Sequence, residues 1–209
     1  MTTQLTITRI KLPLANAYLV QGERPILVDA GAPGDADRIV RALAQKHVRP
    51  ADLALILLTH GHGDAMARSG CNVLGALNGL EARMIAPFVN KPFPPVAASI
   101  LLDAPLDLRA YGVAGEVIAT PGHTAGSVSI FFDNGDAIVG DLLMGGRMGG
   151  ALWSSQSRLH YFVADFAQLA KSIVTVLARR PQRLLVGHGG PLAADAVQAW
   201  SKANQLARR

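Results

Sequence analysis

LILLTHGHGD, residues 55–64, combines the clearest strand signal of the chain with its clearest ligand pattern. The opening residues are apolar, and a short continuous run of this kind is typical of a buried strand. His60 and His62 follow with one residue between them, so in an extended chain both imidazoles leave on the same side. Together with Asp64 they form a donor set that suits a borderline-soft divalent cation such as zinc. We therefore predict a metal site at the carboxyl end of this strand.

Three other segments place a metal-ligating side chain beside small residues. These side chains are His123, Asp141 and His188. Each lies at the end of a β-like run, in a loop whose small residues let the backbone approach a ligand. A lone histidine is more often solvated or hydrogen-bonded than metal-bound. Four such segments in one chain nevertheless favour a shared metal site.

The order and spacing of these motifs resemble the metallo-β-lactamase fold superfamily of hydrolases. Five motifs carry the resemblance over nearly the whole chain: LVDAG at 27–31, THxHxD at 59–64, TPGHTxGS at 120–127, GD at 140–141 and GHGxPL at 187–192. The resemblance implies an α/β fold of the α+β type, a four-layer αββα sandwich. It also implies one domain over residues 1–209, with the metal site at one rim of the two sheets.

The resemblance further implies two sets of metal ligands that share a carboxylate. The first metal would bind His60, His62 and His123. The second would bind Asp64, His188 and a further histidine, with Asp141 bridging the two metals. Asp29, in the first motif, is implied to orient its neighbours without binding metal.

The sequence departs from the family pattern directly after Asp64, where Ala65 replaces the usual further histidine. Residues 66–70 also differ from the usual continuation, which favours a natural subgroup over a single engineered change. The first site keeps three imidazoles and an open position, as catalytic zinc sites do. The second site has lost a ligand and therefore affinity. Three interpretations stay open: a one-metal enzyme, a weak second metal completed by water or another side chain, and a site that binds without hydrolysing.

A metal-dependent hydrolase of a small ester-like substrate, most of all a thioester or lactone, fits this pattern best. Asp64 is the candidate catalytic residue, as the base that orients a metal-activated water. Zn²⁺ is the expected cofactor, as one or two ions, although iron or manganese suits the same donors. Because Asp141 is retained, the chain resembles the glyoxalase II and lactonase members of the superfamily. It lacks the appended helical domain of full-length glyoxalase II enzymes, so a glutathione thioester is only one candidate substrate. A degraded metabolite-binding or sensor-like member is the main alternative, and an iron oxidoreductase is a third class.

The segment 142–164 follows Asp141 directly and is therefore expected to shape the substrate site. Its glycine-rich part favours a flexible loop that covers the substrate. The candidate substrate contacts are Arg147, Trp153, Arg158, His160 and Tyr161. His160 is in addition a candidate for the missing metal ligand. An ordinary connection or a homodimer contact is the alternative interpretation of this segment.

Composition limits the class of protein. With 209 residues, half of them hydrophobic, the chain is long enough for one well-buried domain. The apolar runs are too short to span a membrane, and the start of the chain lacks a signal-peptide pattern. A single cysteine fits a reducing cytoplasm. The net charge of +5 comes from scattered residues, which favours a small-molecule substrate over nucleic acid.

The remaining pattern predicts the elements around the motifs. Strands are expected at 4–10, 16–21, 25–29, 54–59 and 83–86, and at 116–119, 127–133, 136–140 and 183–186. Helices are expected at 35–47 and 70–79 and from about 165 and 194, whereas 87–115 is expected to be mostly loop with a short helix near 96–102.

Overall fold

The computed structural model describes residues 4–32, 34–61, 100, 102 and 104–206. The helix predicted at 70–79 and the strand predicted at 83–86 lie outside the described residues, as do His62 and Asp64.

The first sheet has four strands in the order β1-β2-β3-β4. Their bounds are Thr6–Lys11, Asn16–Gln21, Pro25–Val28 and Leu55–Leu57. The first three pair antiparallel, whereas β4 is parallel to β3 and is reached through helix α1, Ala36–Ala44. The helix buries Ile39 and Leu43 against the outer face of this sheet. Since β4 ends at Leu57, two residues before the predicted strand end, Thr59 and His60 lie in the loop beyond it.

The second sheet has six strands in the order β12-β11-β8-β7-β6-β5. Their bounds are Leu192–Ala193 for β12, Arg183–Val186 for β11, Asp136–Gly140 for β8, Val128–Phe132 for β7, Gly115–Ala119 for β6 and Leu106–Asp107 for β5. The strands β6, β8 and β11 all run in one direction, because β7 is antiparallel to both β6 and β8 and β11 is parallel to β8. Their carboxyl ends therefore meet at one edge.

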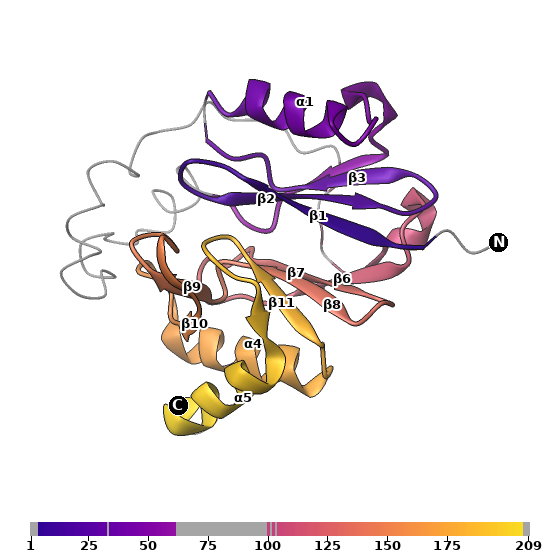
Figure 1. The fold of residues 1–209 in the computed structure, drawn as a ribbon. Coiled ribbons are helices and arrows are strands. Elements are labelled where there is room, and N and C mark those ends of the chain that lie inside the picture. The colour runs from indigo at the N-terminus through magenta and orange to yellow at the C-terminus, as the bar shows by residue number, and fades with distance from the viewer. Residues whose placement is uncertain (1–3, 33, 62–99, 101, 103, 207–209) are drawn as a thin grey trace.

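The two sheets pack face to face and helices cover both outer faces (Figure 1). Tyr18 and Val28 of the first sheet share one core with Ile130 and Ile138 of the second. Helices α4, Phe166–Ala178, and α5, Ala194–Ala203, lie on the far side of the second sheet, where they close another core. Short 3₁₀ turns span Pro50–Asp52 and Leu108–Tyr111. These layers are the αββα sandwich expected from the motifs.

The glycine-rich segment after Asp141 is not the irregular loop expected from its composition. It forms a separate two-stranded sheet of β9, Met144–Arg147, and β10, Leu152–Arg158. The glycines allow close packing rather than flexibility. A Cβ on Gly145 would lie 1.9 Å from the carbonyl oxygen of Ser154, and the Gly145 N–H donates to the carbonyl of His188 at 2.8 Å. The hairpin is thus attached to the loop that carries His188.

None of the helices within the described ranges has the length and apolar character that crossing a bilayer requires.

Candidate metal centre

Four histidines converge on Asp141 from loops at the carboxyl ends of strands. His60 follows β4, His123 lies between β6 and β7, and Asp141 follows β8 directly. His188 follows β11, and His160 lies between β10 and α4. Polar side chains at this end of strands that run in one direction are where α/β folds commonly bind ligands.

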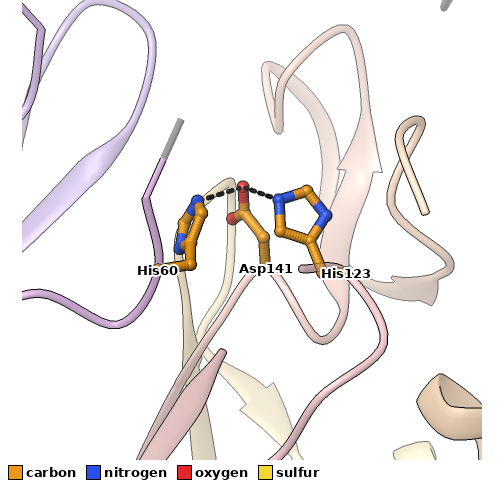
Figure 2. Close-up of side chains that lie close together, drawn as sticks. All are labelled: His60, His123 and Asp141. Carbon is orange, nitrogen blue, oxygen red and sulfur yellow. Dashed lines mark ion pairs between the residues drawn. The ribbon is translucent and has the colours of Figure 1, made fainter. Parts of the chain in front are cut away.

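The carboxylate of Asp141 is the centre of this cluster. Its side chain is buried, and its Oδ2 atom faces an imidazole Nε2 atom from each histidine. The Nε2–Oδ2 distances are 3.3 Å for His60, 3.7 Å for His123, 3.3 Å for His160 and 3.3 Å for His188. Figure 2 shows the His60 and His123 rings on opposite sides of the carboxylate, with both nitrogens directed at it.

These distances fit metal ligands better than direct ion pairs. A charge-assisted N–H···O bond spans about 2.7–2.9 Å, shorter than any of the four. Zinc–ligand bonds of about 2.0–2.1 Å in a tetrahedron place neighbouring ligand atoms about 3.3 Å apart. The spacing between Asp141 and its imidazoles therefore matches the edges of a metal coordination shell, and the nitrogen and oxygen donors suit a divalent transition metal.

The chain also fixes which nitrogen of His60 faces Asp141. The Thr59 hydroxyl lies 2.9 Å from Nδ1 of His60 and 3.0 Å from either carboxylate oxygen of Asp29. Because a carboxylate only accepts, the hydroxyl donates to Asp29 and accepts from Nδ1–H of His60. This leaves Nε2 of His60 as the basic nitrogen toward Asp141. Metal-binding histidines are generally oriented by a hydrogen bond of this kind. The contact agrees with the orienting role expected for Asp29.

A backbone carbonyl positions His123, and a side-chain amide positions the loop of His188. Nδ1 of His123 lies 2.7 Å from the carbonyl oxygen of Phe162, which assigns the proton to Nδ1 and turns Nε2 toward Asp141. The loop of His188 is tied to the first sheet, since the Asn16 amide donates to the carbonyls of Val186 and Gly189 at 2.8 and 3.0 Å. Both sheets therefore contribute to the position of these two imidazoles.

The electrostatics of the cluster follow from burying one carboxylate among several imidazoles. Burial raises the pKa of Asp141, but the imidazoles of His188, His160 and His60 outweigh it and hold this pKa well below 3.8. Burial lowers the pKa of His60 and of His188, but the Asp141 carboxylate outweighs burial and raises both above 6.5. In the metal-free fold, Asp141 thus keeps its negative charge and favours positive charge around it.

Within the described residues, the potential ligand atoms form two groups that share Asp141. One group is His60, His123 and Asp141, and the other is Asp141, His160 and His188. In each group the ligand atoms lie within 4.8 Å of one another. Each group could hold one cation, and the Asp141 carboxylate would belong to both. His62 and Asp64 lie outside the described residues, so their ligand roles remain predictions.

The predicted substrate contacts divide between the cluster and the surface. His160 is buried in the cluster, and Tyr161 packs beside it with the ring centroids 5.9 Å apart. Arg147 and Trp153 lie on the exposed part of the β9–β10 hairpin, where Trp153 is 61% exposed, and Arg158 is half-buried. In the sequence His160 does not follow a glycine-flanked strand end, so the local pattern favours a substrate contact over a metal ligand at this position.

Comparison with known proteins agrees with this geometry. The family model described as the metallo-beta-lactamase superfamily matches residues 11–64. A protein of Methanocaldococcus jannaschii named as a probable metallo-hydrolase is 30% identical over 193 residues, which cover 84% of this chain and 87% of that protein. The chain belongs to the metallo-beta-lactamase superfamily. The membership expected from the five motifs is therefore confirmed.

Two further similar proteins show how far the similarity extends. A hydroxyacylglutathione hydrolase of Acidiphilium cryptum is 31% identical over 196 residues, which cover 88% of this chain and 68% of that enzyme. A metallo-beta-lactamase family protein of Thermus thermophilus has a similar structure, with a TM-score of 0.57 at 18% identity. That match covers 96% of this chain and 79% of the other, and it confirms the fold. The superfamily implies a metallo-hydrolase that binds a divalent metal.

Proposed function

We propose that this chain is a zinc-dependent hydrolase that cleaves a small thioester or lactone in the cytoplasm. The observation that supports the metal most directly is the Asp141 carboxylate, buried with four imidazole nitrogens at 3.3–3.7 Å. His60, His123 and Asp141 would hold one cation, with the predicted ligand His62 beside them. A bound divalent cation would lower the pKa of a water molecule and polarise the substrate carbonyl.

The residues of the chain have separate tasks in this proposal. The Thr59 hydroxyl and the Phe162 carbonyl keep the protons of His60 and His123 on Nδ1, so that both Nε2 atoms stay available as ligands. Asp64, the predicted catalytic residue, takes the proton of the attacking water and passes it to the leaving thiolate or alkoxide. The burial of Asp141 excludes bulk water from the base of the site.

The substrate class is supported by a relative and by the hairpin above the site. The hydroxyacylglutathione hydrolase of Acidiphilium cryptum supports a thioester. Met148 and Trp153, on the β9–β10 hairpin, are 51% and 61% exposed and offer apolar surface for an acyl chain. Arg147 on the same hairpin would pair with an anionic group of the substrate. This chain covers only 68% of the relative, so a glutathione thioester is one candidate among several.

Ala65 supports one competing function, a member that binds a metabolite without hydrolysing it. Metal analysis combined with a panel of thioesters, lactones and phosphodiesters separates the two functions. We expect metal uptake and hydrolysis of at least one thioester or lactone, with both lost in Asp141→Asn. His47→Gln is the matched control, because His47 is exposed in the turn after helix α1 and belongs to neither ligand group. Metal uptake with no hydrolysis of any panel member would favour the competing function.

A further inference from the structure

We propose that His160 supplies the imidazole that the H-x-H-x-D-A motif lacks, so that Asp141, His160 and His188 hold a second cation. The inference rests on the proposed metal-dependent function, but it concerns a residue from a different part of the chain. His160 follows β10, about a hundred residues after the position where the superfamily motif usually carries its last histidine.

The position of the His160 ring is the first argument. Only 3% of the residue is exposed, and Nε2 lies 3.3 Å from Oδ2 of Asp141. Nε2 of His188 lies at the same distance from that oxygen, and the two rings are 5.1 Å apart between centroids. The three ligand atoms lie within 4.8 Å of one another. The resemblance assigned His188 to the second metal, and His160 stands beside it with the same kind of nitrogen.

The backbone around Phe162 is the second argument. Nδ1 of His160 lies 3.3 Å from the Phe162 carbonyl oxygen, which also accepts from Nδ1 of His123 at 2.7 Å. One carbonyl therefore contacts a ring from each of the two groups. With its proton on Nδ1, His160 directs a basic Nε2 toward Asp141, as a metal ligand requires.

A positioning role is the competing explanation for the same contacts. The Phe162 N–H lies 3.2 Å from Nδ1 of His160 and would donate to it in the other tautomer. Nε2–H of His160 would then donate to Asp141 and only orient the carboxylate. The 3.3 Å separation favours the ligand role, because a charge-assisted bond to a carboxylate is about 2.7–2.9 Å long. Glutamine can replace the donor function, but it is a poor ligand for zinc.

Zinc titration of the metal-free wild type, His160→Gln and His47→Gln tests the inference. We expect the wild type and the His47→Gln control to bind two equivalents. His160→Gln should bind the first equivalent normally and the second at least about 10-fold more weakly, as expected from the loss of a ligand. Two equivalents bound by His160→Gln with unchanged affinity would overturn the inference and leave the proposed function intact. A wild type that binds a single equivalent would also overturn it, and one that binds none would overturn both.

Ring nitrogen NMR of the histidine-labelled wild type provides a test that does not depend on a folded variant. Zinc ligation of His160 through Nε2 should fix its proton on Nδ1 and shift the Nε2 resonance when the second equivalent is added. A His160 ring that keeps its proton on Nε2 in the fully loaded protein would assign it the positioning role and contradict the inference.

Discussion

Thr59 donates two hydrogen bonds to the carboxylate of Asp29. The Thr59 hydroxyl lies 3.0 Å and the Thr59 backbone N–H lies 2.8 Å from Oδ1 of Asp29. The same hydroxyl lies 2.9 Å from Nδ1 of His60. The first sheet, whose strand β3 ends just before Asp29, therefore orients a ligand of the proposed metal site through one hydroxyl group. His60 is held in this way before any metal binds.

Thr59→Val should weaken metal binding while the protein remains folded. The variant keeps the size of the side chain but removes the partner of Nδ1, and loss of such an orienting contact reduces metal affinity about 10–100-fold. The partly buried Asp29 carboxylate also loses a hydrogen-bond donor, which should destabilise the fold by about 1 kcal/mol. Zinc affinity and urea unfolding measure the two effects. Thr175→Val, at an exposed position of helix α4, is the control. An equal loss of zinc affinity in both variants would refute the orienting role of Thr59.

Stability of the metal-free protein should fall as the pH rises above 6.5. The pKa values of His60 and His188 are raised in the fold, so their protonated forms stabilise it below 6.5, and this contribution is lost as the pH passes the folded pKa values. The pKa of Asp141 is lowered in the fold, so its ionised form stabilises the folded protein above pH 3.8. This stabilisation is lost as the pH falls through the folded pKa.

Zinc should reverse the high-pH part of this dependence, because ligand imidazoles must be neutral. The increase in Tm on adding zinc should therefore grow from pH 5.5 toward pH 8, with protons released on binding. Thermal unfolding with chelator and with zinc, and calorimetry in buffers of different ionisation enthalpy, measure both effects. An increase in Tm that is the same at all pH values would contradict this assignment.

Gly145→Ala should damage the metal site although Gly145 is not a ligand. The added Cβ would lie 1.9 Å from the Ser154 carbonyl oxygen and 2.4 Å from the Gly190 nitrogen, so the hairpin and the His188 loop must separate. We expect a loss of more than about 2 kcal/mol in unfolding free energy, as for other steric conflicts in packed regions, and weaker binding of the second zinc. Gly126→Ala is the control, because nothing lies within 4 Å of its added Cβ. Near-equal stability of the two variants would show that the hairpin is not attached in this way.

Ala65→His should have different effects in two backgrounds. If His160 already supplies the missing imidazole, a histidine at position 65 should change the affinity for the second zinc less than 10-fold in the wild type. In the His160→Gln background, Ala65→His should raise the affinity for the second zinc at least about 10-fold, because it returns the lost ligand. Equal gains in both backgrounds would mean that the two positions act independently.

Much of the fold follows from local sequence patterns. The strands β2, β3, β8 and β11 begin and end within about one residue of their predicted bounds, because apolar runs bordered by glycine or charged residues leave little choice. The hairpin at 144–158 escaped prediction, since Gly145 and Gly146 suggest flexibility in isolation. Their role emerges only when the Ser154 and His188 backbones pack against them.

The convergence of His60, His123, Asp141 and His188 could be predicted because each follows a strand within a motif, whereas their role as metal ligands stays a prediction. His160 carries no such signal, because a short turn after β10 positions it and its partners are far away in sequence. The sequence shows that a usual ligand is missing at Ala65 and offers His160 only as one candidate, whereas the three-dimensional arrangement places the His160 imidazole beside Asp141 and His188. The relative positions of side chains that converge from separate loops depend on tertiary packing rather than on the local sequence pattern.

Crystals of the zinc-loaded protein, measured at the zinc absorption edge, test the central claim most directly. We predict an anomalous peak about 2.0–2.1 Å from Nε2 of His60 and of His123, and a second peak bonded to His160 and His188, with Asp141 between the two. Crystals that show no anomalous peak at Asp141, with the imidazoles hydrogen-bonded directly to its carboxylate, would contradict the account.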